Sequence, residues 1–443
     1  MLDMEYTEYE KCLFDFLDTS PTCFHAVENI RRYLGRYTRL EESQPWKLEP
    51  GKKYYVMRNG SSLISFRIPQ RDLTGFQIVA SHTDSPTFKI KENPEKDVNK
   101  AYVQLNTEKY GGMIFTTWMD RPLGIAGRVM LRDEDGKIIT RLIQIKRDMV
   151  IIPSVAIHMN RQVNDGYKFD PQVDMLPLYG CGEAAGKYQE EIAKAAWNVP
   201  QEDILGTDLF LYNRAKSTKW GTQGEFISSP HLDDLECVFT SLLAYVYSED
   251  TPSDFSVPVY AVFDNEEVGS GTKQGADSNF LEDTLRRINL ALGRGEEGYY
   301  TSLASSFMVS ADNAHAVHPN HPEYSDPTNQ VFMNKGIVIK YNANQKYTTD
   351  AVSAAVFKAV CQKAGVPYQT FVNRSDMAGG STLGNISNSH VSVNTVDIGL
   401  AQLSMHSSYE TAGSLDIDYM VRGLTAFYSS AIQADKDGSY SII

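Results

Sequence analysis

The 443-residue chain is longer than one ordinary hydrophobic core supports, so we expect two domains or one domain that carries a large insertion. Its residues are 42% hydrophobic and 22% charged, which is typical of a folded soluble protein. Because 56 acidic residues outnumber 42 basic ones, the net charge of -14 repels phosphate backbones, and we expect no nucleic-acid partner.

The cysteines and the lack of long apolar runs predict a cytoplasmic protein. The five cysteines are scattered and form no C-x-x-C pair, which indicates reduced thiols. The N-terminal stretch "MLDMEYTEYEKCLFDFL" mixes acidic with apolar residues and lacks the basic start of a signal peptide. No run of about 18 apolar residues occurs, so we expect no membrane partner.

The first 94 residues predict helices followed by strands. Apolar residues at helical spacing over 4–34, broken by "TSPT", indicate two helices. The stretch "YYVMRNGSSLISFRI" alternates around an Asn-Gly turn and predicts a hairpin. The continuous apolar run Gly75–Ala80 predicts a strand that is buried on both faces.

Residues 95–224 differ from the rest of the chain in their sequence pattern. Short alternating strands turn at Asp-Gly, and Gly and Pro interrupt the remainder. We therefore expect a β-rich inserted domain over 95–224, with some helix near 183–197. The surrounding domain is then discontinuous and comprises 1–94 and 225–443.

Helices and apolar strands alternate after residue 225. This order predicts an α/β fold with a mostly parallel central sheet that is flanked by helices. The expected helices are 232–247, 278–293 and 349–364, and the expected strands are 257–263, 307–310, 336–340 and 396–399.

Reactive side chains follow the predicted strands, where open α/β sheets carry their working sites. His82 and Asp84 follow the strand that ends at Ala80, and an Asp in this position can orient the imidazole of a metal-binding His. A loop His beside a turn Asp is an equally good interpretation of this pair. Asp233 and Asp234 stand in the first turn of a predicted helix, where capping alone ordinarily explains acidic residues.

Two adjacent glutamates come directly after the strand 257–263. On an extended backbone Glu266 and Glu267 point in different directions, so one can bind a metal while the other faces the attacking water. Asp312 follows the next strand, and His406 stands in a loop after the last one. Together these imidazoles and carboxylates predict a site for two ions of zinc, manganese or cobalt that share one carboxylate.

The motifs "SHTDSP", "SPHLDDLECVF", "VFDNEEVGSG", "SADNAHAVHPN" and "MHSSYE" occur in this order from residue 82 to residue 410. Their combination resembles the dinuclear zinc aminopeptidases of the aspartyl aminopeptidase and aminopeptidase I family. The resemblance implies that Asp233 bridges two zinc ions. It implies His82 and Asp312 as the other ligands of one ion, and Glu267 and His406 as those of the second.

The same resemblance implies the remaining roles. Glu266 is the expected general base, and Asp84 orients His82. His158, in "SVAIHMNR", is expected to reach the active site of a neighbouring subunit within a tetrahedral dodecamer. The stretch "NRSDMAGGSTLG" resembles the substrate-pocket loop, with Asp376 as the partner of the substrate α-amine. The weaker candidates for the same pocket are His315, Lys340 and Thr382.

The resemblance predicts a peptide substrate with a free N-terminus and leaves its first residue open. "GGSTLGN" replaces the family stretch "CGTTIGP", so acidic and neutral N-terminal residues are both possible. Two rival functions also remain open. A dinuclear deacylase or carboxypeptidase needs an arginine for the substrate carboxylate, and Arg374 is the candidate. A non-catalytic oligomeric scaffold is expected to have lost metal ligands, whereas all five are present.

Overall fold

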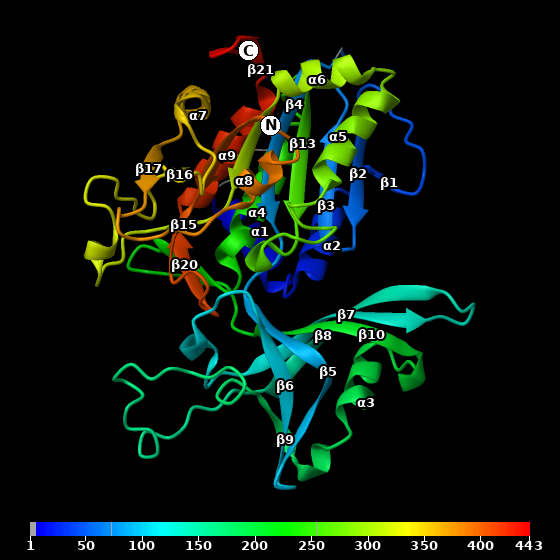
Figure 1. Ribbon diagram of the computed structural model, residues 1–443, viewed down its shortest axis with the longest axis vertical. Coiled ribbons are helices and arrows are strands. Elements are labelled where there is room, and N and C mark those ends of the chain that lie inside the picture. Colours follow the sequence, from blue (N-terminus) through cyan, green and yellow to red (C-terminus); the bar gives the residue numbers. More distant parts are fainter. Residues whose placement is uncertain (1–5, 72, 254) are drawn as a thin grey trace.

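The computed structural model describes residues 6–71, 73–253 and 255–443. Figure 1 shows two bodies, a larger one built around a central sheet and a smaller one below it. The segments before residue 87 and after residue 213 form most of the larger body, and the cyan to green segment between them forms the smaller one. This arrangement agrees with an inserted segment that leaves the main sheet and returns to it.

The larger body contains a nine-stranded sheet with the order β1-β2-β3-β13-β4-β14-β18-β16-β17. Its central strands β13, β4, β14 and β18 are parallel, whereas β3 pairs with β13 and β16 pairs with β18 in antiparallel fashion. The sheet is therefore parallel at its centre and mixed at its margins. The strands are β1 Thr38–Leu40, β2 Lys53–Arg58, β3 Ser62–Arg67, β4 Gly75–His82, β13 Ser256–Phe263, β14 Phe307–Ala311, β16 Ile337–Tyr341, β17 Tyr368–Val372 and β18 Asn394–Gly399.

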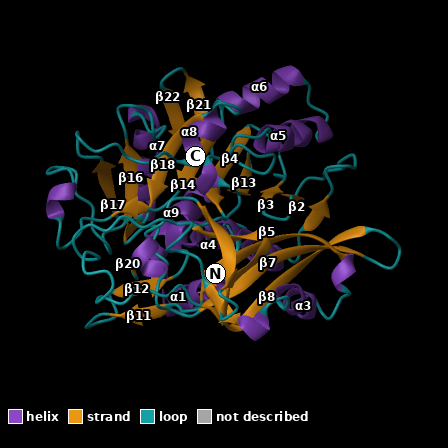
Figure 2. Cartoon of the chain, turned by 60° about the horizontal axis from the view of Figure 1, so that its bottom comes forward, coloured by secondary structure: helices purple, strands orange, loops and turns teal. Residues whose placement is uncertain are grey.

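Helices cover both faces of this sheet (Figure 2). Successive strand residues point to opposite faces, so Val79 joins one core cluster while Ile78 and Ala80 join the other. One face carries α1 Tyr6–Asp18, α2 Cys23–Tyr33, α4 Leu232–Tyr247, α7 Ala351–Ala364 and α9 Asp416–Ser429. The other face carries α5 Phe280–Ala291, α6 Glu296–Ala304 and α8 Leu383–Asn388.

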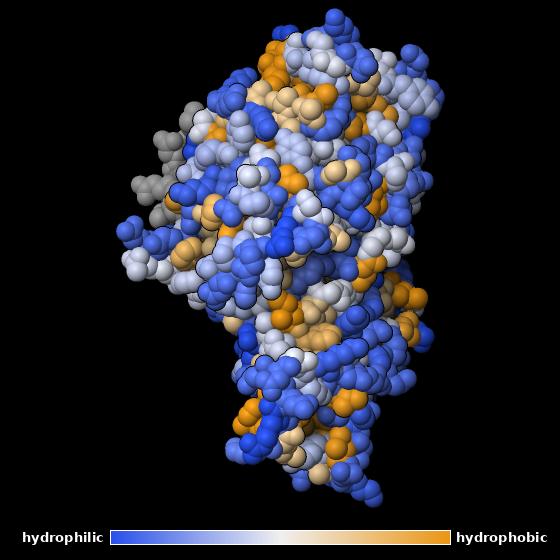
Figure 3. Space-filling view, turned by 60° about the vertical axis from the view of Figure 1, so that its left-hand side comes forward, coloured by the Kyte–Doolittle hydropathy of each residue, from blue (hydrophilic) through white to orange (hydrophobic). Residues whose placement is uncertain are grey.

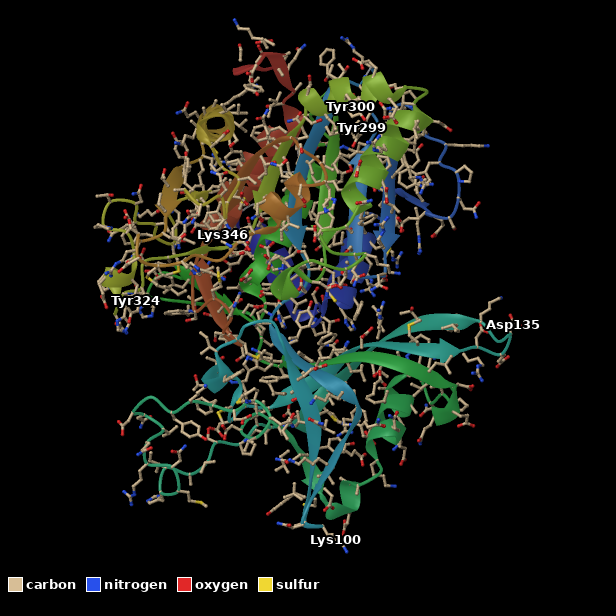
Figure 4. All side chains as sticks on the ribbon, in the orientation of Figure 1. Lys100, Asp135, Tyr299, Tyr300, Tyr324 and Lys346 are labelled. Atoms are coloured by element: carbon tan, nitrogen blue, oxygen red, sulfur yellow. The ribbon has the colours of Figure 1, made fainter. Side chains whose placement is uncertain are left out.

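The smaller body is a six-stranded antiparallel sheet with its own hydrophobic core. Lys100, at the turn between β5 and β6, marks its far end from the larger body (Figure 4). Its elements are β5 Thr87–Val98, β6 Tyr102–Tyr110, β7 Leu123–Arg132, β8 Ile138–Val150, β9 Leu178–Cys181, α3 Tyr188–Ala195 and β10 Ile204–Asn213. The sheet thus spans 87–213, somewhat earlier in the chain than the expected range of 95–224.

A third, five-stranded sheet lies at the carboxyl edge of the main sheet. It contains β11 Thr218–Trp220, β12 Phe226–Ser229, β15 Ala314–His315, β19 Ala401–Leu403 and β20 Glu410–Gly413. A hairpin of β21 Ile432–Lys436 and β22 Ser439–Ile442 ends the chain. Among the described helices, none has the length and apolar character that crossing a membrane requires.

Most expected elements are present, and several others were missed. The helix 232–247 has the predicted bounds, and the other expected strands and helices agree to within a few residues. Residues 4 and 5 of the expected N-terminal helix lie outside the described residues. The missed helices are α6, α8 and α9, and the missed strands include β1, β17 and the short strands of the third sheet. Of these, α9 carries a detectable signal, because Ile417, Met420, Val421 and Leu424 follow helical spacing.

Candidate metal centre

The strand order brings the predicted ligands to one edge of the central sheet. His82 is the last residue of β4, and Asp312 follows the last residue of β14. Glu267 lies in a 3-10 turn, Glu266–Val268, just after β13. Because these three strands are parallel and adjacent, their carboxyl ends meet at the same edge. The start of α4 and the loop between β19 and β20 add Asp233 and His406.

Asp233 lies between the two imidazoles. Its Oδ1 is 3.5 Å from Nε2 of His82, and its Oδ2 is 3.4 Å from Nε2 of His406. Nε2 of His82 is also 4.0 Å from Oδ1 of Asp312, and Nε2 of His406 is 3.4 Å from Oε1 of Glu267. One carboxylate thus faces two separate pairs of ligands, as a bridging ligand does.

These separations fit metal coordination better than hydrogen bonding. Direct N–H···O bonds have lengths of about 2.7–3.2 Å. A tetrahedral zinc ion with bonds of about 2.0–2.1 Å keeps its ligand atoms about 3.3–3.5 Å apart. Oδ1 of Asp233 and Oε1 of Glu267 are buried and accept no hydrogen bond from any described residue. The donor set therefore fits zinc, and these two oxygens have no better partner among the described groups.

Several carboxylates are buried close together, which favours the binding of cations at this site. Burial, together with the neighbouring Asp233 carboxylate, raises the pKa of Glu267 well above its usual range. Burial also raises the pKa of Glu266 to about 7 against the opposing effect of His82, and the Asp312 carboxylate adds a smaller upward contribution. Two like charges 4 Å apart repel by about 4 kcal/mol at an effective dielectric constant of 20. Cations at this position remove that cost.

The expected extended backbone at the glutamates is wrong, and the aspartates lie in the first turn of α4, as predicted, with a distorted backbone. Glu266 and Glu267 lie in a 3-10 turn and not on an extended backbone, because Asn265 and Gly269 on either side have φ of 65° and 95° and turn the chain sharply. Asp233 and Asp234 do not adopt the helical angles of a first turn, and the peptide bond between them is cis. Both side chains point inward and are buried.

Asp84 lies beside His82 and also contacts the turn that carries Glu266 and Glu267. Its Oδ1 is 3.4 Å from Nδ1 of His82, and its backbone oxygen is 3.1 Å from the same nitrogen. The two carboxylate oxygens also accept hydrogen bonds from the backbone N–H groups of Glu266 and Glu267, each at 3.1 Å. One buried carboxylate therefore fixes a ligand on β4 and the turn after β13.

Glu410 is a buried residue beside the site that the sequence did not single out. It is 2% exposed and accepts hydrogen bonds from the backbone N–H groups of Asp233, at 3.0 Å, and His406, at 2.8 Å. It thereby ties together the two segments that provide these side chains. Its position in the motif "MHSSYE", close after His406 in the chain, was the available signal.

The candidate ligands line a cavity of about 280 Å³. Three predicted pocket residues line it, namely His315, Lys340 and Thr382. Nζ of Lys340 is buried and donates to the backbone oxygens of Asp312, at 2.8 Å, and Asn313, at 3.3 Å. Burial opposes its charge, but the Asp312 carboxylate together with Tyr347 and Asp397 outweighs burial and raises the pKa of Lys340. The cavity therefore has a cationic wall as well as an acidic floor.

Two further candidates do not lie in this cavity. The Asp376 carboxylate is 65% exposed and forms an ion pair with Arg374, with Nε and Oδ1 2.9 Å apart. His158 is exposed in the segment between β8 and β9 of the smaller body. Within a single chain the structure therefore brings together His82, Asp233, Glu266, Glu267, Asp312 and His406, and leaves Asp376 and His158 apart from them.

Comparison with known proteins gives consistent matches. Residues 16–428 match the family described as "Aminopeptidase I zinc metalloprotease (M18)". A Clostridium acetobutylicum protein named as an M18 family aminopeptidase is 46% identical, over 95% of this chain and 99% of its own. "Aspartyl aminopeptidase 1" of Schizosaccharomyces pombe is 38% identical, over 95% of both chains. The "Structure of S. cerevesiae mApe1 dodecamer" superposes with a TM-score of 0.84 at 27% identity, over 96% of this chain and 97% of that one.

We expect removal of metal by a chelator to lower the thermal unfolding midpoint, because the buried carboxylates then repel one another. An ion present at 100 times its Kd adds about 2.7 kcal/mol, or roughly 3 °C for a chain of this length. Calorimetry with and without chelator, followed by zinc addition, measures the shift. The double variant His82→Ala/His406→Ala is the control and should not respond. An unchanged midpoint in wild-type protein that has demonstrably lost its metal would contradict the expectation.

Proposed function

The chain belongs to the M18 family of zinc metalloproteases, and we propose that it removes N-terminal residues from peptides with two zinc ions and Glu266 as general base. As a member of this family, the protein is a metal-dependent aminopeptidase, a hydrolase. The observation that carries the detailed proposal is the position of Asp233, with one carboxylate oxygen toward each imidazole.

The residues divide into two ligand sets that share Asp233. His82 and Asp312 complete one set, and Glu267 and His406 complete the other. Asp233 also belongs to both groups of side chains whose ligand atoms lie within 4.8 Å of one another. Mixed nitrogen and oxygen ligands without thiolate suit zinc, and they also accept Mn²⁺ or Co²⁺.

Glu266 performs the proton transfers. When bound, zinc lowers the pKa of the attacking water and polarises the scissile carbonyl. Glu266 lines the cavity but belongs to neither ligand set, so its carboxylate is free to take a proton from that water. It then gives the proton to the leaving amine. Its raised pKa, about 7, suits both halves of this exchange at neutral pH.

The rival functions have less support. The arginine that a deacylase or carboxypeptidase would need, Arg374, is paired with Asp376 and does not line the cavity. The acidic floor of the cavity favours a protonated α-amine over a carboxylate. The scaffold hypothesis requires lost ligands, whereas all five ligand positions are occupied by suitable residues.

The substitution Glu266→Gln tests the central proposal. We expect kcat to fall by at least 10²-fold, because an amide cannot accept the proton, while zinc content stays at two ions per chain. Elemental analysis and hydrolysis of amino-acid amides measure both quantities. Glu297→Gln, in the first turn of α6, is the matched control and should keep full activity. Near-normal turnover in the Glu266 variant would refute its role, and one ion per chain would refute the dinuclear site.

We propose further that the enzyme prefers acidic N-terminal residues. Lys340 provides a buried cation in the wall of the cavity, where a substrate side-chain carboxylate can reach it. A relative at 38% identity is named as an aspartyl aminopeptidase. His315 and Thr382 line the same cavity, and we assign them to the same pocket.

A panel of amides of Asp, Glu, Leu and Ala, each with a free or an acetylated amine, tests this specificity. A charge-assisted contact contributes about 1.5–3 kcal/mol, so we expect kcat/KM for Asp and Glu to exceed that for Leu by about 10-fold or more. Lys340→Met should remove this preference, whereas Lys358→Met, on α7, should keep it. Equal rates for Asp and Leu, or hydrolysis of the acetylated amides, would contradict the proposal.

We assign 1–94 and 225–443 to the catalytic domain and 95–224 to an inserted domain that mediates assembly into a dodecamer. The segment between β8 and β9 exposes several apolar residues, and Figure 3 shows orange patches on the lower body among blue atoms. A solved relative at 27% identity is a dodecamer. His158 belongs to this exposed segment, so we propose that it completes the cavity of a neighbouring subunit.

Light scattering tests the assembly. We expect the mass of a dodecamer for wild-type protein and smaller species for Met159→Asp, because Met159 is 83% exposed beside His158. Loss of assembly should also lower activity, since each site then lacks the neighbour's His158. Leu290→Asp, on α5 of the catalytic domain, is the control at a similarly exposed apolar residue. A monomeric wild-type enzyme with full activity would refute both the assembly and the role of His158.

We propose a cytoplasmic location for the protein. The five cysteines are all free in the structure, and three of them are buried, which suits a reducing compartment. Cell fractionation tests the assignment, and recovery of the enzyme outside the cytoplasm would contradict it.

A further inference from the structure

A short segment of the inserted domain touches the metal ligands directly. This segment, residues 110–117, begins at the last residue of β6 and continues through the turn Phe115–Trp118; we call it the strap. It leaves the six-stranded sheet and crosses the site between Asp84 and His406. The strap therefore lies close to both sets of candidate metal ligands and belongs to the same chain as they do.

The first contact of the strap is the hydroxyl of Tyr110. It donates a hydrogen bond to Oδ2 of Asp84 at 2.8 Å and accepts one from Nδ2 of Asn265 at 2.8 Å. Asp84 in turn faces Nδ1 of His82 and holds the turn that carries Glu266 and Glu267. The ring of Tyr110 packs edge-on against Phe210 of the inserted sheet, with ring centroids 5.7 Å apart. Tyr110 thus joins the inserted sheet to the groups that orient the ligands.

The two glycines of the strap lie against the second ligand set. A Cβ on Gly111 would stand 3.1 Å from Cβ of Glu267, so the backbone packs directly on this ligand. A Cβ on Gly112 would stand 4.0 Å from Nδ1 of His406, so the strap also lies beside this imidazole. The N–H of Ile114 donates to the backbone oxygen of His406 at 3.1 Å. A larger residue at Gly111 would push the strap away from Glu267.

The end of the strap fixes the loop that carries His406. The backbone N–H of Ser408 donates to Oγ1 of Thr117 at 2.9 Å, and Oγ of Ser408 donates to the backbone oxygen of Thr117. The loop is also held from β10, because Nδ2 of Asn213 donates to the backbone oxygen of Ser408 at 2.8 Å. The position of His406 therefore depends on the inserted domain as much as on the main sheet.

We propose that the strap is a positioning element for the metal centre, with Tyr110 and Gly111 as its positioning residues. Tyr110 holds Asp84, and through it His82 and the glutamate turn, while Gly111 allows the backbone to support Glu267. The inserted domain then sets metal affinity within its own chain, apart from any part it plays in assembly. This inference rests on the proposed zinc site.

The substitution Tyr110→Phe tests the first contact without removing the ring. Loss of a partner that orients metal ligands typically costs 10–100-fold in metal affinity, so we expect the zinc Kd to rise by about that factor. Competition with a chromophoric chelator measures the Kd, and the visible spectrum of the cobalt-loaded protein reports altered ligand geometry. Tyr212→Phe is the matched control, because its hydroxyl contacts Gln144 and Ile145 of the same inserted sheet.

Gly111→Ala tests the second contact, and Gly136→Ala is its control. Both glycines have φ of 78°, so both substitutions impose the same backbone strain, but a Cβ on Gly136 meets nothing within 4 Å. We expect weaker zinc binding in the Gly111 variant alone, with equal thermal midpoints for the two metal-free variants. This pair decides the question if Tyr110→Phe fails to fold.

The outcomes separate this inference from the proposed function. Wild-type protein that binds no zinc would refute the metal site itself. Wild-type protein that binds zinc normally, with unchanged Kd and cobalt spectra in both Tyr110→Phe and Gly111→Ala, would refute the strap and leave the site intact. Equal losses in a test variant and its control would show general destabilisation and would also refute it.

Discussion

The repulsion among buried carboxylates at the edge of the central sheet is the constraint on which the rest of the site depends. Asp233, Glu267 and Asp312 are held close together, with two imidazoles and the ammonium of Lys340 as the nearest opposite partners. Hydrogen bonds do not resolve this repulsion, since oxygens of Asp233 and Glu267 find no described donor. Bound cations would offset this repulsion. The 3.4–3.5 Å distances between several ligand atoms match those between the ligands of one zinc ion.

The parallel centre of the sheet makes this concentration of charge possible. The last residues of adjacent parallel strands lie at the same edge of the sheet, so short loops are enough to place each ligand there. Close packing beneath the site adds a requirement for small residues. A Cβ on Gly399, the last residue of β18, would meet the backbone oxygen of Asp312 at 1.9 Å. The sheet therefore provides rigid supports for the ligands and leaves little room for them to relax away from one another.

The supports of the ligands come from every part of the chain. Asp84 and Glu410 hold ligand segments within the larger body. The inserted body adds Tyr110 and the backbone of Gly111, which lie against Asp84 and Glu267. The two bodies thus have separate cores but share the supports of the site, because the inserted sheet carries the segment that lies against the ligands.

The sequence by itself determined the alternation of strands and helices, the β-rich insertion and the residues that form the ligand cluster. These follow from local patterns: apolar periodicity, turn residues, and polar motifs directly after apolar strands. Tertiary structure alone decided that Asp233 faces both imidazoles, that Glu410 and Tyr110 orient the ligands, and that Asp376 pairs with Arg374 outside the cavity. The physical reason is that these contacts join residues far apart in the chain or depend on backbone turns, and neither leaves a periodic signal in the sequence.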